Sequence, residues 1–199
     1  DLIHEIKKQM QKQYKSDPLS NKNYGKIINE KHFTRICTLI DPDKVVCGGD
    51  SNPETLQIAP TVMDNVTFED AVMQEEIFGP LLPVIAYDSI DEALAFVNNR
   101  EHPLALYLFS EDPALQKRVL ASVPFGGGCI NDTIVHLATS RMGFGGVGHS
   151  GMGSYHGKKS FDTFSHEKSV LKKSTRIDMP VRYMPYTPLK DRLLRVFLR

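Results

Sequence analysis

The sequence predicts an α/β fold in which helices cover a mainly parallel β-sheet. The main observation is the order of elements between residues 82 and 131, where three apolar segments alternate with two segments that begin with helix-capping residues. The first apolar segment, Leu82–Tyr87, is continuously apolar, which is typical of a strand buried on both faces of a parallel sheet. Helices between such strands provide the crossover that parallel pairing requires.

Two helices and two strands are expected before this alternation. The first helix has apolar residues at four-residue spacing in Leu2, Ile6 and Met10, which places them on one face. An Asp-Pro pair ends this helix, because the residue before a proline is driven out of the helical region. The expected elements here are a helix ended by Asp17-Pro18, a helix over 29–40, and strands over 44–47 and 57–63.

Both helices of the alternating region carry start signals. Ser89 and Glu92 have the spacing of a capping box, in which each side chain accepts a backbone N–H at the helix start. Asp112 is expected to cap the second helix, with Pro113 at the first helical position, where a missing N–H costs nothing. The expected order is strand 82–87, helix 89–99, strand 104–110, a helix from 112 and strand 127–131.

The last forty residues predict a short helix, an exposed strand and a terminal helix. The helix is expected over 158–166, and residues 167–173 alternate as an exposed strand does. Residues 189–199 place their apolar side chains on one side of a closing helix. We therefore divide the chain into a body, residues 1–166, and a tail, residues 167–199.

The composition is that of a globular protein. The chain has 199 residues, 41% of them hydrophobic and 24% charged, so it can bury a core. Its longest apolar run is Leu81–Tyr87, far short of the about 20 residues that a membrane-spanning helix needs. Cys37, Cys47 and Cys129 are odd in number and lack metal-ligand spacing. We expect free thiols in a reducing, cytoplasmic setting and no metal site.

The net charge of zero hides an asymmetry between the body and the tail. Residues 1–167 carry 15 Lys and Arg against 22 Asp and Glu, whereas residues 168–199 carry 9 against 2. One interpretation is a tail that is solvated or docked on the acidic body. The other is weak contact with a membrane surface or a polyanion. Nucleic acid is not expected, because the tail aromatics are not interleaved with glycines as in a stacking platform.

The segment from Gly143 to Gly157 has seven glycines in fifteen residues. A loop of this kind is costly to order, which indicates that its backbone approaches something closely. Residues 143–148 match the spacing G-x-G-x-x-G of dinucleotide-binding turns. That motif requires an apolar strand directly before it and a helix directly after it, and the sequence supplies neither. We therefore expect no dinucleotide fingerprint here.

Two adjacent carboxylates, Glu75 and Glu76, stand before Ile77-Phe78-Gly79-Pro80 between two predicted strands. One interpretation is a turn with a solvated acid pair. The other is the lip of a pocket, where a carboxylate accepts hydrogen bonds from a ribose diol and Phe78 lies against a flat ring. The chemistry of the residues leaves both interpretations open.

A second polar candidate is Asn131, which follows a glycine-rich run into the last predicted strand. Polar residues at the carboxyl ends of strands are where α/β sheets place ligands. An ordinary helix-to-strand turn is the alternative. Cys129 lies in the same strand with no basic residue beside it, which favours a buried, unreactive thiol over a nucleophile.

Four motifs stand in the order seen in the aldehyde dehydrogenase superfamily: Pro60-Thr61, Met73–Pro80, Pro124-x-Gly-Gly-x-x-x-Asn131 and Phe144–Gly151. The sequence from Phe144 to Phe161, with Thr163–His166 after it, resembles the class 3 and fatty-aldehyde branch of that superfamily. The resemblance covers nearly the whole chain and is weakest after about residue 175.

The resemblance implies an activity that needs residues outside this chain. Members begin with a nucleotide-binding domain, and their nucleophilic Cys would fall a short way before Asp1. Because the chain opens without Met inside an amphipathic pattern, we expect it to be a piece of a longer protein. The implied reaction is attack of a thiolate on an aldehyde, hydride transfer to NAD or NADP, and hydrolysis of a thioester by water that an upstream Glu activates.

The motif positions also imply roles for residues of this chain. These roles are cofactor binding for Glu76 and Phe78, ordering of the site for Asn131, and lining of the site and its substrate funnel for Phe144, Tyr155 and His156. The strand over 167–173 resembles the family's oligomerisation segment and implies a homodimer. The closing helix resembles terminal helices that pack over a substrate entrance, and contact with a membrane surface is its alternative.

The predicted function is part of an NAD(P)-dependent aldehyde dehydrogenase that oxidises aliphatic or aromatic aldehydes to carboxylic acids. The alternative is a catalytically inactive folded fragment that serves as a dimerisation or assembly module. A third possibility is the sister branch of semialdehyde or acylating dehydrogenases. The sequence Tyr155–Lys159 favours the class 3 side.

Overall fold

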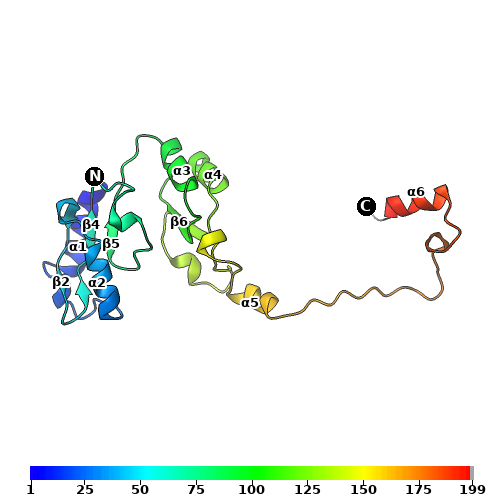
Figure 1. Cartoon of the computed structure of the whole chain (residues 1–199), viewed down its shortest axis with the longest axis horizontal. Helices are drawn as coiled ribbons and strands as arrows, with labels where there is room; N and C mark the ends of the chain where they lie inside the picture. Colours follow the sequence, from blue (N-terminus) through cyan, green and yellow to red (C-terminus); the bar gives the residue numbers. More distant parts are fainter. Residues whose placement is uncertain (198–199) are drawn as a thin grey trace. The chain divides into compact units, whose positions relative to one another are not determined.

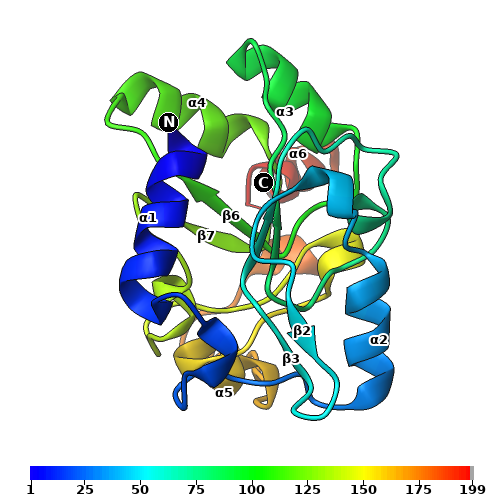
Figure 2. The same cartoon turned by 90° about the vertical axis from the view of Figure 1, so that its left-hand side faces the viewer.

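The computed structural model describes residues 1–197, with side chains for residues 1–196 (Figures 1 and 2). The chain divides into two compact units, residues 1–99 and residues 100–199. Helices alternate with short strands, and parallel strand pairs occur in both units, so the predicted α/β class is confirmed. The sequence analysis divides the chain at another place, after residue 166, where the tail begins. That division stays a prediction.

The first unit builds two small sheets from five short strands. In the larger sheet, β4 lies between β1, which is antiparallel to it, and β5, which is parallel to it. In the smaller sheet, β2 and β3 form an antiparallel pair. The elements are α1 (Leu2–Tyr14), α2 (Glu30–Thr38), β1 (Val45–Cys47), β2 (Ser51–Asn52), β3 (Gln57–Ile58), β4 (Thr61–Met63), β5 (Leu81–Pro83) and α3 (Ile90–Asn98). Short 3-10 turns lie at Pro18–Ser20, Pro42–Lys44 and Ala71–Met73.

Two expected strands of this unit differ from the structure. The run 57–63 is not one strand, because Ala59-Pro60 separates β3 from β4 and the two halves pair in different sheets. Proline has no N–H to donate to a ladder, which explains the break at this point. The strand expected over 82–87 ends at Pro83, and Leu82 is half exposed rather than buried on both faces.

The predicted helix starts are confirmed by side-chain hydrogen bonds. Asn29 Oδ1 accepts the His32 N–H at 2.9 Å and begins α2. Ser89 Oγ accepts the Glu92 N–H at 3.3 Å and begins α3, although the Glu92 carboxylate accepts from Asp88 N–H rather than from Ser89. Such caps satisfy N–H groups that have no partner within a helix.

The core of the first unit lies between α2 and the strands. Ile36 and Met63 are fully buried, and Phe33 is 7% exposed. Spacing of three residues places Phe33 and Ile36 on one face of α2, and Figure 2 shows that helix beside β3. The other buried members are Leu39, Ile58, Val66, Val72 and Leu81. This packing fixes the face of α2 that is turned towards the motif at residues 74–80.

An ion pair closes the loop that leads to this motif. Lys44 Nζ lies 2.5 Å from Asp70 Oδ2, which also accepts the Thr67 N–H at 2.7 Å. The hydrogen bonds from Lys44 and then from Thr67 hold the pKa of the Asp70 carboxyl below its ordinary value of 3.8. A carboxyl whose pKa is lowered by folding stabilises the folded state above its ordinary pKa and loses that contribution as the pH falls.

We therefore expect Asp70→Asn to lower stability at about pH 7 and to lower it by less at about pH 3, because the contribution of a lowered pKa is lost as the pH falls below the ordinary value of 3.8. Urea unfolding midpoints of both proteins at the two pH values measure the difference. Asp43→Asn, which removes a nearby exposed carboxylate, is the control and should show no such pH-dependent gap. An equal gap at both pH values would contradict the assignment.

The second unit contains a parallel pair of strands joined by a helix. Strands β6 (Ala105–Leu108) and β7 (Gly127–Ile130) pair in parallel register, and α4 (Pro113–Ser122) connects them. Asp112 Oδ1 accepts the Ala114 N–H at 2.8 Å, and Pro113 occupies the first turn of α4. The predicted strand-helix-strand unit is confirmed here, and Val119 of the helix is buried whereas Leu120 is exposed.

The chain beyond β7 is built from short turns and two helices. These elements are the 3-10 turns Val135–Leu137, Gly148–Ser150 and Pro180–Arg182, and the helices α5 (Gly157–Thr163) and α6 (Pro188–Phe197). In contrast to the prediction, residues 167–173 form no strand in the single chain. A segment becomes a strand only when its backbone forms hydrogen bonds with a second strand, and an alternating sequence does not by itself provide that second strand. No helix within residues 1–197 has the length and apolar character that crossing a membrane requires.

Hydrogen bonds within the tail hold its turns together. Asp178 accepts from Lys173 at 2.6 Å and from Tyr183 Oη at 2.9 Å, and these bonds lower its pKa to about 2. Lys190 Nζ donates to the carbonyls of Tyr183 at 2.8 Å and Pro185 at 3.0 Å, which anchors the start of α6. Of the expected closing helix, Leu198 and Arg199 lie outside the described residues.

Candidate functional site

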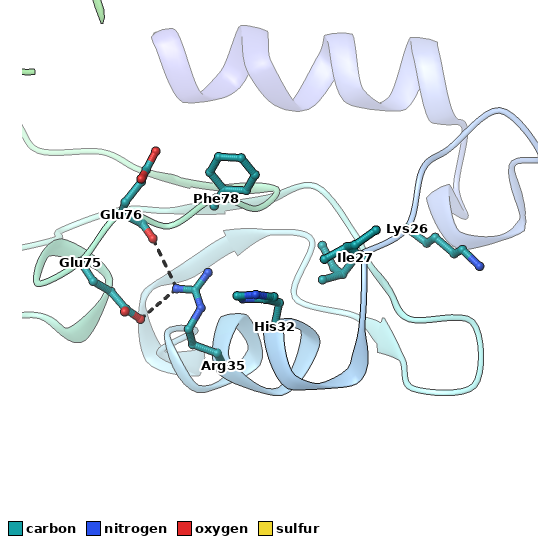
Figure 3. Close-up of a pocket in the computed structure, with 8 residues that line it drawn as sticks. Lys26, Ile27, His32, Arg35, Glu75, Glu76 and Phe78 are labelled. Atoms are coloured by element: carbon teal, nitrogen blue, oxygen red, sulfur yellow. Dashed lines mark hydrogen bonds and ion pairs between the residues drawn. The ribbon is translucent and has the colours of Figure 1, made fainter. Parts of the chain in front are cut away.

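A cavity of about 640 Å³ lies between α2 and the motif at residues 74–80 (Figure 3). Cavities of this size are typical of small-molecule and cofactor sites. Both predicted cofactor-binding residues, Glu76 and Phe78, line it. The other lining residues are Lys26, Ile27, Ile28, His32, Arg35 and Glu75.

The two adjacent acids of the motif have different environments. The Glu75 carboxylate forms an ion pair with Arg35 at 2.9 Å. Glu76 uses only its backbone carbonyl, which accepts from Arg35 at 3.3 Å. Figure 3 shows the Glu76 side chain on the other side of the loop, pointing away from Arg35. One acid is thus paired with the helix, whereas the carboxylate of the other makes no hydrogen bond or ion pair with the described residues.

The Phe78 ring stands at the lip of the cavity. Its side chain is 84% exposed, and its backbone φ of +48° is a left-handed conformation that aromatic residues seldom adopt. Gly79, the next residue, lies against α2 so closely that a Cβ there would be 2.7 Å from Ile36 Cδ1. The glycine lets the loop return to the helix, and this return leaves the ring of Phe78 outside the core.

These groups suit a ligand that combines a flat ring with a sugar diol. An exposed aromatic face can pack against a ring, and a carboxylate can accept hydrogen bonds from two hydroxyl groups. The residues present therefore fit the nicotinamide half of NAD or NADP. Among the described residues, no group of three His, Cys, Asp or Glu side chains could hold a metal ion.

Phe144, expected to line a substrate funnel, and Tyr155 and His156, expected to lie near the site, come together in the second unit. The rings of Tyr155 and His156 have centroids 4.3 Å apart, and Phe144 lies 5.8 Å from Tyr155 and 6.2 Å from His156. Backbone hydrogen bonds in both directions join Phe144 to Tyr155, at 2.9 and 3.0 Å. This bridge brings together residues that are eleven positions apart in the sequence.

The glycine-rich loop between Phe144 and Tyr155 packs against backbone. A Cβ on Gly146 would lie 2.0 Å from the Ser150 carbonyl oxygen, and a Cβ on Gly126 would lie 2.2 Å from that of Gly145. The close approach that the glycine content predicts is therefore made to the chain itself. A cavity of about 400 Å³ borders the loop and is lined in part by Phe144 and Tyr155.

Asn131 joins the carboxyl ends of the two parallel strands. Its Nδ2 donates to the Ser110 carbonyl at 3.0 Å, and its Oδ1 accepts the Ser110 N–H at 2.8 Å. Its own N–H donates to the Leu108 carbonyl, and its φ is +58°. Both ends of the amide are thus engaged in fixing the loops that leave β6 and β7.

The sequence analysis missed two sets of contacts. Arg35 reaches a motif about forty residues away, and Cys129 Sγ lies 3.5 Å from His136 Nδ1. Basic residues at 32 and 35, one turn apart on a helix, were a weak signal for the first set. No local signal marked the second, because seven residues and a turn separate the thiol from the imidazole.

The chain was compared with known proteins. Residues 1–170 match the Aldehyde dehydrogenase family. The 4,4'-diaponeurosporen-aldehyde dehydrogenase of Staphylococcus aureus is 50% identical over 94% of this chain and 41% of its own length. The dimeric, NADP-preferring aldehyde dehydrogenase of Mus musculus is 47% identical over 88% of this chain and 39% of its own length. Further relatives at 44 to 48% identity are named as members of aldehyde dehydrogenase family 3.

Solved structures of the family have the same fold. The substrate-bound state of Staphylococcus aureus AldH superposes with a TM-score of 0.92 at 47% identity, over 100% of this chain and 44% of that one. The Mycobacterium tuberculosis aldehyde dehydrogenase complexed with NAD+ gives a TM-score of 0.66 at 31% identity, over 79% of this chain and 33% of that one. Members of the family use NAD or NADP.

The chain spans about two fifths of the length of the curated relatives it matches. The match to the family nevertheless extends over residues 1–170, well beyond half of the chain. The branch suggested by the motifs agrees with the relatives named as family 3. The chain belongs to the aldehyde dehydrogenase family.

Proposed function

We propose that the protein containing this chain is an NAD(P)-dependent aldehyde dehydrogenase that oxidises aliphatic or aromatic aldehydes to carboxylic acids. The observation that carries the proposal is that one cavity is lined both by Glu76, whose carboxylate is unpaired among the described residues, and by the exposed Phe78. The chain that contains this cavity belongs to the aldehyde dehydrogenase family, which supports the same proposal. The cavity suits a nicotinamide riboside, whose two halves need these two kinds of contact.

In this proposal, Glu76 accepts hydrogen bonds from the ribose hydroxyls, and Phe78 limits the positions of the nicotinamide ring. Bound NAD or NADP supplies the hydride acceptor. The Glu76 carboxylate is suited to its role because Arg35 is already engaged by Glu75 and by two backbone carbonyls. The charge of Glu76 is therefore available for a hydroxyl donor.

Phe144, Tyr155 and His156 provide an aromatic wall for the aldehyde in this proposal. Their ring centroids lie 4.3 to 6.2 Å from one another, and Phe144 and Tyr155 also line the cavity beside the glycine-rich loop. Asn131 acts indirectly, because both ends of its amide bond to Ser110 and hold the ends of β6 and β7.

The nucleophile is proposed to be a Cys upstream of Asp1, which the resemblance to the family implies. Its thiolate adds to the aldehyde carbon, hydride leaves that carbon, and water hydrolyses the resulting thioester to the acid and the free thiol. None of the described side chains is assigned to these steps. Cys129 is not proposed as the nucleophile, although its Sγ lies 3.5 Å from His136 Nδ1, because its position in the sequence does not match that of the family's nucleophilic Cys.

The remaining expectations belong to the same proposal. A cytoplasmic homodimer is proposed, with residues 167–173 as the pairing segment, and one relative is named as dimeric. The closing helix is proposed to pack over the substrate entrance, with weak contact to a membrane surface as its alternative. An inactive assembly module remains the second candidate, because the chain spans about two fifths of its relatives.

The proposal is tested first by the denatured intact mass of the protein that supplies this chain, followed by an absorbance assay for NADH or NADPH. A mass well above 22.4 kDa and aldehyde-dependent cofactor reduction are expected. A protein of 22.4 kDa that reduces neither cofactor with short or long aliphatic or with aromatic aldehydes would support the assembly module instead.

A further inference from the structure

We propose that Arg35 is a positioning residue that holds the loop of residues 75–79 in the shape in which Glu76 and Phe78 meet the cofactor. This inference rests on the proposed function, because it concerns the same cavity. Arg35 itself is given no contact with the cofactor. Its role is to fix the backbone from which the two contacting side chains project.

The guanidinium of Arg35 makes three contacts with successive residues of the loop. Its Nη1 lies 2.9 Å from the Glu75 carboxylate and 3.3 Å from the Glu76 carbonyl oxygen, and its Nη2 donates to the Ile77 carbonyl at 2.6 Å. Two backbone carbonyls and one carboxylate are thus held by one planar group. An ammonium cannot reproduce this fork, because its donors radiate from a single atom.

The next residue of α2 fastens the other end of the loop. Ile36 is fully buried, and Gly79 packs directly against its side chain. Arg35 and Ile36 therefore hold residues 75–77 and residue 79 from adjacent positions on one helix. The helix is fixed in turn by the Asn29 cap and by the core beneath it.

Phe78 is the residue that lies between these two attachments. A non-glycine residue at a φ of +48° is strained and persists only where its surroundings enforce it. Release of residues 75–77 would let the backbone of Phe78 relax to an ordinary conformation. Both the ring and the Glu76 carboxylate would then move, since they project from the released segment. A site held ready in this way binds without first paying to order the loop.

The test compares Arg35→Lys with wild type in the full-length protein. Lys31→Gln is the matched control, because it removes a positive charge from the same helix at an exposed position outside the cavity lining. Glu75→Gln is the second variant, which weakens the loop contact without altering α2. The first measurement is the rate of cleavage after Glu76 by a Glu-specific protease in the absence of cofactor. The second is the Kd of NADH by fluorescence. The third is kcat together with separate KM values for the oxidised cofactor and for the aldehyde.

For Arg35→Lys we expect cleavage after Glu76 at least about fivefold faster, a NADH Kd about tenfold higher, and a raised KM for the oxidised cofactor with the KM for aldehyde unchanged. Glu75→Gln should show the same pattern at a smaller size, and Lys31→Gln should match wild type. A purely structural role would lower the active fraction, and therefore kcat, while Kd and both KM values stayed constant.

The inference is overturned if wild type binds NADH while Arg35→Lys and Glu75→Gln match Lys31→Gln in cleavage and in Kd. If wild type neither binds NADH nor oxidises aldehydes, the proposed function fails, and the cleavage rates still report whether Arg35 holds the loop. If Arg35→Lys unfolds, Glu75→Gln decides between the two outcomes.

Discussion

Replacing Glu76 by Gln in the full-length protein is expected to lower kcat/KM for the nicotinamide cofactor about thirtyfold with little change in melting temperature. Hydrogen bonds to a charged group contribute about 1.5–3 kcal/mol, and 1.4 kcal/mol corresponds to a factor of ten. The fold should not change, because the side chain is exposed and its carboxylate makes no hydrogen bond or ion pair with the residues that the structure describes. Steady-state kinetics and a thermal unfolding curve measure the two quantities.

Glu69→Gln is the control for this variant, since it removes one exposed carboxylate from the same unit away from the cavity lining. It should leave both kcat/KM and melting temperature unchanged. If Glu76→Gln keeps the turnover and cofactor affinity of wild type, the ribose role of Glu76 must be abandoned. The family assignment would stand, because it does not depend on this residue.

Replacing Ile36 by Ala is expected to lower the free energy of unfolding by about 3 kcal/mol. Ile36 is fully buried at the centre of the core beneath α2, so truncation removes apolar burial and leaves a void. The same change deprives Gly79 of the side chain against which it packs. NADH affinity should therefore fall even under conditions where the variant remains folded. Urea unfolding and a NADH titration measure the two effects.

Ile36→Val is the graded control. It should lower the free energy of unfolding by about 1 kcal/mol with little loss of NADH affinity. Ile28→Ala is the exposed control for stability, because this side chain is 83% exposed and truncation removes little buried surface. A loss of stability in Ile36→Ala no greater than that in Ile28→Ala would contradict the position of Ile36 in the core.

Much of the fold was predictable because its signals are local. The caps Asn29, Ser89 and Asp112 act on N–H groups within a few residues of themselves, so the sequence places the helix starts well. The strand-helix-strand unit around α4 was predictable for the same reason. The strands were less predictable, because a strand depends on a partner that the local sequence does not specify.

Residues 57–63 and 167–173 illustrate the difference. The first run has the composition of one strand, yet it divides at Ala59-Pro60 and pairs in two sheets. The second alternates as a strand should, yet it has no ladder in the single chain. The order of polar and apolar residues shows which face of a strand could be buried. Which segment that strand pairs with depends on the path of the rest of the chain.

The sequence by itself determined the α/β class, the helix starts and the motifs that connect this chain with the aldehyde dehydrogenase family. Only the tertiary structure decided which of the two adjacent acids has its carboxylate paired and which does not. Glu75 and Glu76 differ in no local property, and the difference comes from Arg35, forty residues away. Hydrogen bonds act over about 3 Å. Arg35 can therefore pair with one of these two acids only after packing of the core has placed α2 against the loop.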